Sequence, residues 1–414
     1  MTQTHIADLL FILHSKPLKP QNLGPFVMSQ TATTMGERIP NDVVEDILGQ
    51  LPVKSLTRFR CVSRSCDSII TDPTFITKHF KLNLNQSESL VSTNTHTGYL
   101  LYTTEDKNSS PSSKHLCTVV CNSDSTLTQI SRFEIPSLFE KYSIVGFCNG
   151  LFCLASSDND LNHIIYLWNP SIRMFKKLLA TPFTDEDNKK HKSSVVGLAY
   201  NSQNNDFKIL RLLSVLLGPE AKAEVEIYSL STDSWRKVVI SMESLRGYEP
   251  NLGRIVKIDP PCIFLNGALH TVVMTIRHRF ILSFDVNDES FREIMFPFNY
   301  SDVVTKYQLA LFKRSLAVFV FARSLGGVLC HIWVMEEYGV AESWTRKYMV
   351  PMIWVRVGNF YGCTDNGELL IENATGLVSI DPESREQNIL AIEDVDWVGF
   401  MANSMESLIL HDGE

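Results

Sequence analysis

Residues 38–80 have the sequence RIPNDVVEDILGQLPVKSLTRFRCVSRSCDSIITDPTFITKHF, in which helix-start signals recur at short intervals. Pro40 and Pro52 can each open a helix, because the first helical turn tolerates a missing backbone N–H. Ser63 is a capping residue for a third helix, and Asp72 with Pro73 forms a cap and first-position pair for a fourth. The stretch therefore predicts four short helices in series.

The first two helices are rich in apolar residues at helical spacing. These residues are Val43, Val44, Ile47, Leu48, Leu51, Val53, Leu56, Phe59 and Val62. A unit of roughly 50 residues or fewer is marginal as an independent fold, and exposed apolar surface marks an interaction site. We therefore expect a permanent partner on this unit. The alternative is a helical cap that packs only on the following domain.

The same stretch resembles an F-box, the adaptor-binding module of cullin-based ubiquitin ligases. The matching positions are Ile39-Pro40, Asp42, Ile47-Leu48, Leu51-Pro52-Val53-Lys54-Ser55-Leu56, Arg58, Arg60-Cys61-Val62-Ser63, Ile69-Ile70, Asp72-Pro73 and Phe75. The resemblance implies that a Skp-type adaptor binds through Ile39, Pro40, Ile47, Leu48, Leu51, Pro52, Val53, Leu56 and Val62. One position departs from the family: Cys66 stands where a Trp is usual, and loss of the ring would loosen the helix packing or weaken the adaptor contact.

Beyond about residue 88 the apolar pattern changes to strand-like alternation. Residues 261–296 show the unit most clearly, as the segments PCIFL, ALHTVVM, FILSFD and SFREIMF separated by turn signals such as Asn266-Gly267. Asn-Gly is a strong hairpin signal, because both residues accept the positive φ of a type I′ turn. The unit therefore predicts a four-stranded antiparallel sheet.

This unit recurs along the rest of the chain, at 142–178, 194–238, 307–350 and 356–390, with a fainter copy between 88 and 133. Its first turn repeats as Asn149-Gly150 and Asn366-Gly367. Paired aromatic residues mark its last hairpin: Trp168 with Phe175, Tyr228 with Trp235, Phe284 with Phe291 and, across a longer turn, Trp333 with Trp344. We expect these side chains to pack between neighbouring sheets.

Six such units predict a β-propeller, because sheets stacked in a ring cover one another. Seven blades, or a sandwich of the same strands, are the alternatives. The tail 395–410 is expected to supply a strand that closes the ring. The fold class is therefore α+β multidomain: a poorly structured extension over 1–35, a helical F-box over 36–82 and an all-β propeller over 83–414.

The strand-rich region also resembles the F-box-associated, kelch-like domain of plant F-box proteins. The resemblance rests on GFCNGLFCL, LWNPSIR, VEIYSLSTDSW, FLNGALH, SFDVNDESFREI and IWVMEEYGVAESW. A clean double-glycine kelch signature is missing. With the F-box, the resemblance implies a substrate receptor of a cullin–RING ligase, which binds a protein target such as an immune receptor, a transcription regulator or a stylar ribonuclease.

Composition narrows the other classes of function. The nine cysteines have no paired spacing, which favours reduced thiols in the cytosol or nucleus over disulfides or a zinc site. The net charge of −8 disfavours nucleic-acid binding and favours a basic partner. The apolar segment IADLLFILH is too short to span a membrane and lacks the features of a signal peptide.

No nucleotide-binding, metalloprotease or serine-hydrolase motif occurs, so we expect no enzyme activity, cofactor or metal. His270 and His331 lie in predicted strands, where a packed imidazole is the simpler interpretation. A propeller glycosidase would need convergent carboxylates, and the sequence shows no such set. A second alternative is a scaffold whose F-box binds the adaptor without ligase output.

The expected target site lies on the longer, irregular loops of the propeller, 179–193, 214–223, 241–260 and 297–305. Binding residues commonly occupy such loops above a rigid scaffold. Their candidate contacts are Asp185, Lys189, Arg246, Tyr248 and Tyr300.

Overall fold

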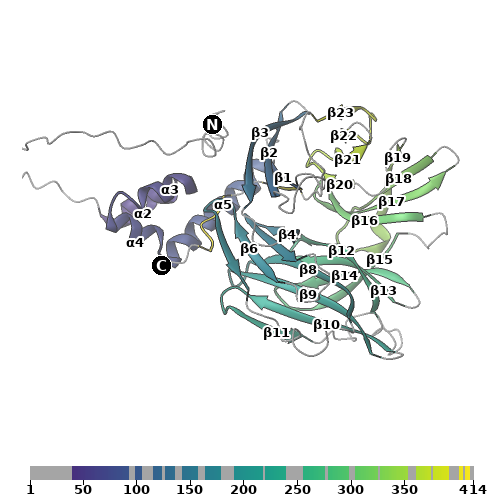
Figure 1. The fold of residues 1–414 in the computed structure, drawn as a ribbon, viewed down its shortest axis with the longest axis horizontal. Helices are drawn as coiled ribbons and strands as arrows, with labels where there is room; N and C mark the ends of the chain where they lie inside the picture. Colours follow the sequence, from purple (N-terminus) through teal and green to yellow (C-terminus); the bar gives the residue numbers. More distant parts are fainter. Residues whose placement is uncertain are drawn as a thin grey trace, which may run out of the picture.

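The structure is a computed structural model. It describes residues 40–92, 98–104, 115–123, 126–135, 142–156, 164–178, 191–217, 220–238, 255–275, 278–297, 304–324, 327–352, 360–373, 376–390, 401–403 and 406–410. The expected extension over residues 1–35 lies outside this part of the chain. Figure 1 shows a small group of helices at one side of a larger body of strands.

Four helices form the helical unit, residues 40–92. They are α2 (Asn41–Gly49), α3 (Val53–Phe59), α4 (Arg64–Ile70) and α5 (Pro73–Ser92). The predicted caps are confirmed, since Ser63 Oγ accepts the Cys66 amide at 3.1 Å and Asp72 Oδ1 accepts the Thr74 amide at 2.7 Å. Both bonds satisfy donors that lack a partner inside the helix. The expected domain boundary after residue 82 falls inside α5, which carries the chain toward the strands.

The strands described by the structure form six four-stranded sheets, here called A to F. Sheet A contains β24 (Met401–Asn403), β1 (Gly98–Thr104), β2 (His115–Ser123) and β3 (Thr126–Ile135), and sheet B contains β4 (Tyr142–Cys148), β5 (Leu151–Ser156), β6 (Ile165–Asn169) and β7 (Met174–Lys177). Sheet C contains β8 (His191–Asn201), β9 (Asp206–Leu217), β10 (Glu220–Ser229) and β11 (Ser234–Val238), and sheet D contains β12 (Ile255–Leu265), β13 (Ala268–Thr275), β14 (Arg279–Asp285) and β15 (Phe291–Met295). Sheet E contains β16 (Val304–Phe312), β17 (Ser315–Ser324), β18 (Gly327–Met335) and β19 (Trp344–Met352), and sheet F contains β20 (Phe360–Cys363), β21 (Leu369–Asn373), β22 (Gly376–Ile380) and β23 (Gln387–Ile389). A one-turn 3₁₀ helix, η3 (Ala341–Ser343), precedes β19.

These sheets are arranged as a β-propeller. Each is an antiparallel meander, and the first strands of successive sheets contact one another in the order β4, β8, β12, β16, β20 and β24. Six separate sheets are present rather than two stacked ones, so the sandwich alternative is wrong. The predicted closing strand is confirmed: β24 pairs with β1 through Tyr99 opposite Asn403 and Leu101 opposite Met401.

Apolar side chains fill the spaces between neighbouring sheets. Between sheets C and D, Leu210, Ile227, Val273 and Phe284 belong to one buried cluster. Similar clusters join B to C, D to E, and E to F. Burial on both faces explains why many of these strands are apolar at successive positions.

Three of the four predicted aromatic registers are confirmed. Trp168 lies opposite Phe175, Tyr228 opposite Trp235, and Phe284 opposite Phe291. The fourth is wrong, because Trp344 lies opposite Met335 while Trp333 lies opposite Arg346. The longer turn that contains η3 sets this register, because the pairing runs without a shift from Met335 opposite Trp344 to Trp333 opposite Arg346.

The predicted type I′ turns hold at two of three positions. Asn149 with Gly150, and Asn266 with Gly267, all have positive φ. At the third position only Gly367 has positive φ, because it lies in a longer turn between Cys363 and Leu369. A hydrogen bond of 3.1 Å, donated by the Glu368 amide to the Thr364 hydroxyl, closes that turn.

Candidate interaction surfaces

The helical unit has its own apolar core. Leu48, Val53, Leu56, Ile70 and Phe75 are each at most 3% exposed and form one cluster. Cys66 is half-buried and packs against this cluster, so the small thiol stands at the edge of the core and not inside it. The core is filled without the ring that the family usually supplies there.

Large apolar side chains remain exposed on this small unit. Among the described residues, Val43 is 43% exposed, Ile47 54%, Phe59 39% and Val62 69%. Val43 and Ile47 are four positions apart on α2 and therefore share one face of that helix. A unit with a filled core and such exposed residues presents an interaction surface.

The structure separates the predicted adaptor residues into three groups. Pro40, Ile47 and Val62 are exposed, and Leu51 and Pro52 are half-buried. The side chains of Leu48, Val53 and Leu56 are buried in the core, and adaptor binding through them stays a prediction. These three side chains support the exposed surface from beneath. Ile39 lies outside the described residues.

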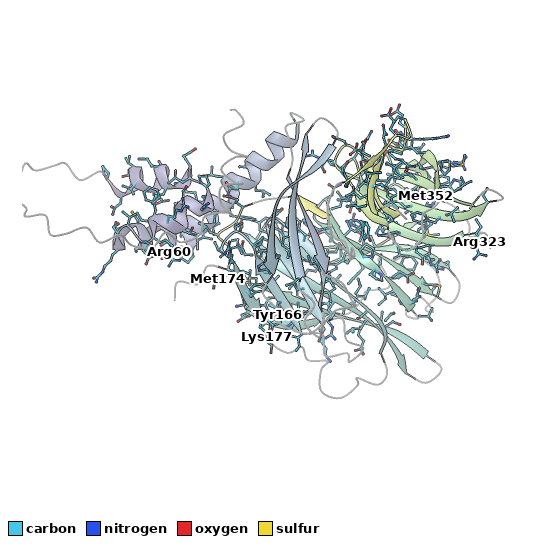
Figure 2. All side chains as sticks on the ribbon, turned by 45° about the horizontal axis from the view of Figure 1, so that its top comes forward. Arg60, Tyr166, Met174, Lys177, Arg323 and Met352 are labelled. Carbon is cyan, nitrogen blue, oxygen red and sulfur yellow. The ribbon has the colours of Figure 1, made fainter. Side chains whose placement is uncertain are left out.

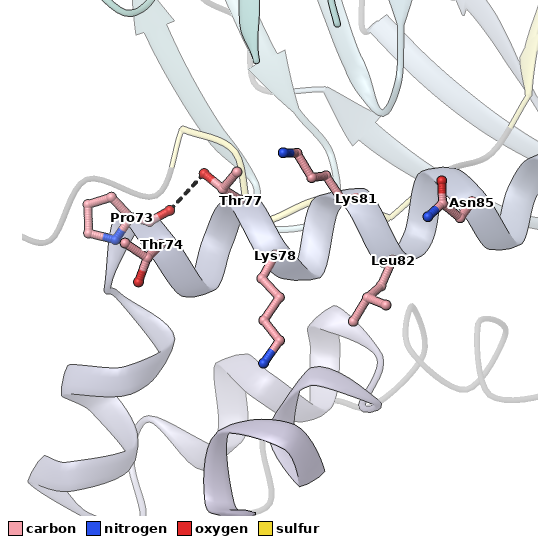
Figure 3. A pocket seen from close by; sticks show the side chains of 7 residues that line it. All are labelled: Pro73, Thr74, Thr77, Lys78, Lys81, Leu82 and Asn85. Carbon is pink, nitrogen blue, oxygen red and sulfur yellow. Dashed lines mark hydrogen bonds between the residues drawn. The ribbon is translucent and has the colours of Figure 1, made fainter. Parts of the chain in front are cut away.

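A shallow groove runs along α5, with a volume of about 550 Å³. Figure 3 shows Lys78 and Leu82 pointing from α5 toward the neighbouring helices, while Thr77 and Lys81 point the other way. Lys78 Nζ lies 2.8 Å from Asp46 and 3.3 Å from Glu45, which joins α5 to α2. Leu82, which is half-buried, lies beside Gly49 of α2 and continues the same contact. The groove is therefore the margin of a helix–helix junction.

The helical unit is attached to sheets B and C. Phe80 of α5 packs edge-on against Tyr200 and Phe207, with ring centroids 5.1 and 5.7 Å apart. Ile172, in the turn between β6 and β7, packs against the core of the helical unit. Figure 2 shows Met174, which follows this turn, beside the helical unit and Arg323 at the far end of the propeller.

The last described residues of the chain, 406–410, lie at this junction. The Val53 amide, at the start of α3, donates to Glu406 Oε2 at 2.8 Å. Leu408 is fully buried in the core of the helical unit. The sequence predicts a strand in this tail, but the packing of Leu408 into the core of the helical unit was not predicted. The apolar run Leu408-Ile409-Leu410 was the available signal.

The predicted target contacts Asp185, Lys189, Arg246, Tyr248 and Tyr300 lie outside the described residues. Parts of two of the expected loops are corrected by the structure. Over 214–217 and 220–223 the backbone belongs to β9 and β10, which pair as far as Leu217 opposite Glu220. The expected irregular loop is therefore an extended hairpin. Residues 255–260 likewise belong to β12 and not to a loop.

His270 belongs to a buried polar contact between sheets D and E. Its Nε2 lies 2.8 Å from the Tyr338 hydroxyl and 3.3 Å from Ser283 Oγ, and its Nδ1 lies 3.3 Å from the Ile263 carbonyl oxygen. Burial lowers the pKa of His270 to about 4. The serine is itself 5% exposed, so this pair does not form an accessible nucleophile and base. The prediction of a packed imidazole is confirmed.

Within the described ranges, no group of His, Cys, Asp and Glu side chains is arranged to hold a metal ion. Seven cysteines in those ranges are free thiols, and burial raises the pKa of Cys262 to about 12. The helices that the structure describes include none that is both long and apolar enough to cross a bilayer.

Comparison with known families agrees with this architecture. Residues 37–78 match the F-box domain, and residues 85–403 match the F-box associated beta propeller domain. The second match spans most of the chain. The chain therefore belongs to the F-box associated beta propeller family, and its helical unit is an F-box.

Curated proteins from Arabidopsis thaliana are similar to most of the chain. The F-box/kelch-repeat protein At3g23880 is 28% identical over 76% of this chain and 79% of its own length. The F-box protein At3g07870 is 29% identical over 84% and 86%, respectively. The F-box protein CPR1 is 26% identical over 86% of this chain and 85% of its own length. The chain is thus similar to these plant F-box proteins over 76–86% of its length.

Proposed function

We propose that this chain is the substrate-recognition subunit of a cullin–RING ubiquitin ligase of the SCF type. The F-box binds a Skp-type adaptor, and through it a cullin, while the propeller binds a protein target. The observation that carries the proposal is the exposed apolar set Val43, Ile47, Phe59 and Val62 on a unit whose core is already filled. Such a surface is favourable in water only when a partner covers it.

In this role the chain carries out no chemical step. It holds the target close to a conjugating enzyme that carries ubiquitin, so that the transfer of ubiquitin to the target becomes effectively intramolecular. We propose action in the cytosol, the nucleus or both, and no cofactor. The net charge of −8 favours a basic target surface.

We further propose that the six sheets are the blades of one closed ring, with the target on the face away from the F-box. In each blade the turn between strands one and two and the turn between strands three and four share a face. The F-box junction uses this face, since Ile172 lies in a three-to-four turn and Tyr200 and Phe207 flank a one-to-two turn. The opposite face carries the β9–β10 hairpin. We propose that the target contacts Asp185, Lys189, Arg246, Tyr248 and Tyr300 belong to this face.

The adaptor assignment is tested with full-length protein co-expressed with a Skp-type adaptor. Ile47→Asp combined with Val62→Asp should abolish co-purification, because two charges then enter an apolar interface. Ile389→Asp is the matched control, since Ile389 is an equally exposed apolar residue (67%) on the propeller. The wild type, the double variant and the Ile389→Asp control should unfold at the same temperature. Undiminished adaptor capture by the double variant would contradict the proposal.

The same purification separates the ligase from a scaffold. Recovery of cullin along with the adaptor supports the ligase, whereas adaptor without cullin supports a scaffold. For the target face, loops 179–190 and 241–254 are replaced by Gly-Ser linkers. Targets trapped by proximity labelling under proteasome inhibition should be lost while the adaptor is retained. Normal target capture by this variant would place the target elsewhere.

A further inference from the structure

The C-terminal segment Glu406–Leu410, here called the strap, touches the F-box and the propeller at the same time. It follows β24, the strand that completes sheet A, by only a few residues. Leu408 is fully buried among F-box side chains, whereas Leu410 packs in the cluster between sheets B and C. Ile409 contacts both clusters. One short segment therefore contributes to two cores.

On the F-box side, the strap supplies groups that the F-box lacks. Glu406 Oε2 accepts the Val53 amide at 2.8 Å, where Pro52 precedes the helix and offers no side-chain cap of its own. Asn83 of α5 donates its amide to the Glu406 carbonyl oxygen at 3.3 Å. A carboxylate at a helix start satisfies an orphan donor and complements the helix dipole. Leu408 then adds a fully buried side chain to the apolar core of the helices.

On the propeller side, the strap is held by a buried amide. Asn169, which is 0% exposed, donates from Nδ2 to the carbonyl oxygens of Ser407 and Ile409, at 2.9 and 2.7 Å. The Ser407 amide donates to Ser171 Oγ at 3.2 Å. Three hydrogen bonds from one turn therefore fix the strap backbone. Removing a partner from such a buried set leaves unsatisfied polar groups, which is costly.

We propose that the strap is a structural part of the F-box, which holds the adaptor-binding surface in its binding-competent form and fixes its orientation on the propeller. The expected effect of the strap on adaptor affinity rests on the proposed function. The expected effect of the strap on the stability of the F-box helices does not. Burial raises the pKa of Glu406, and the Val53 amide and Lys54 oppose that shift. The F-box is thus completed by residues more than 300 positions away in sequence.

The proposal predicts that damage to the strap reaches the adaptor surface. In full-length protein, Leu408→Ala with Glu406→Ala removes the apolar plug and the cap. Hydrogen exchange of amides in α3 and α4 should accelerate at least tenfold, and the adaptor Kd should rise at least tenfold. Amides of β17, far from the junction, should exchange as in wild type. Ile389→Ala, which truncates an exposed propeller residue, is the control.

A second variant tests the coupling from the propeller side. Asn169→Ala removes the hydrogen bonds to the strap, and no hydrogen bond from this side chain to the F-box is described. Faster exchange in α3 in this variant would show that the strap transmits the change. Wild-type exchange in α3 in both variants would overturn the proposal. If wild-type protein fails to bind the adaptor, the proposed function fails, and the exchange measurements still decide whether the strap completes the F-box.

Discussion

Arg211 and Glu226 lie directly opposite each other on β9 and β10 and form a buried ion pair, with 3.4 Å between Nη1 and Oε2. Their side chains are 2% and 0% exposed. Strand alternation places them on the same side as Ile209 and Tyr228, which pack toward sheet B. Burial lowers the pKa of Arg211, and Glu226 opposes that shift. The pair therefore brings two charges into an interface that is otherwise apolar.

We expect Glu226→Gln to destabilise the propeller by about 3–5 kcal/mol, because it leaves a buried guanidinium without its countercharge. The double variant Arg211→Met with Glu226→Leu should cost less than that single change. Chemical denaturation of the wild type, both single variants and the double variant gives the coupling energy. Additive effects would show that the two charges do not depend on each other.

A pH dependence follows from His270, whose pKa burial lowers from 6.5 to about 4. The unfolded chain binds a proton near pH 6.5, while the folded chain remains unprotonated at this site until about pH 4. The free energy of unfolding should therefore decrease as the pH is lowered through this window, by on the order of 1.4 kcal/mol per pH unit. His270→Gln keeps hydrogen-bonding capacity toward Tyr338 but cannot titrate. Its stability should fall less steeply than that of wild type, and parallel slopes would refute the assignment.

The turn between β16 and β17 carries stored backbone strain. Lys313 and Arg314 have φ values of 46° and 67°, in the left-handed region that is disfavoured for residues other than Gly and Asn. The corresponding turn of sheet D is Asn266-Gly267, with φ values of 50° and 76°. Arg314→Gly should raise the free energy of unfolding by about 1 kcal/mol. Gly267→Ala should have the opposite sign, and thermal melts that show the same sign for both would contradict this explanation.

Close packing between sheets C and D depends on Gly197. A Cβ atom there would lie 2.4 Å from Cys262 Sγ and 3.0 Å from Leu269 Cδ2, so Gly197→Ala should cost about 1–3 kcal/mol. Adding Cys262→Ala should recover part of this loss, because the nearest atom is removed. Gly49→Ala is the control: its Cβ would meet only Leu82, at an ordinary 3.8 Å. Equal destabilisation by the single and double variants would show that the sulfur is not the obstacle.

Local signals in the sequence predicted the elements well. Pro52, Ser63 and Asp72 marked helix starts because capping depends on residues next to one another in the chain. The aromatic pairs such as Trp168 and Phe175 marked hairpins for the same reason. Where the register depends on an irregular turn, as at Trp333, the spacing was not sufficient.

The exposed surface was harder to predict than the helices. Ile47 and Leu48 are adjacent and both apolar, yet one is 54% and the other 3% exposed. When a helix is apolar on two faces, the sequence pattern does not show which face packs into the core and which face stays exposed. The strap was missed because Glu406 and Val53 are 353 positions apart, and no local pattern reports such a contact.

Because β24 supplies the first strand of sheet A, the earliest of the described sheets is completed by the last of the described strands to be synthesised. Until then β1 has an open edge, and open edges invite pairing with other chains. Loss of residues 401–414 would remove only 14 of the 414 residues yet leave both this edge and the plug site of Leu408 empty. Late truncations in the gene should therefore behave as severe alleles, with products removed by protein quality control.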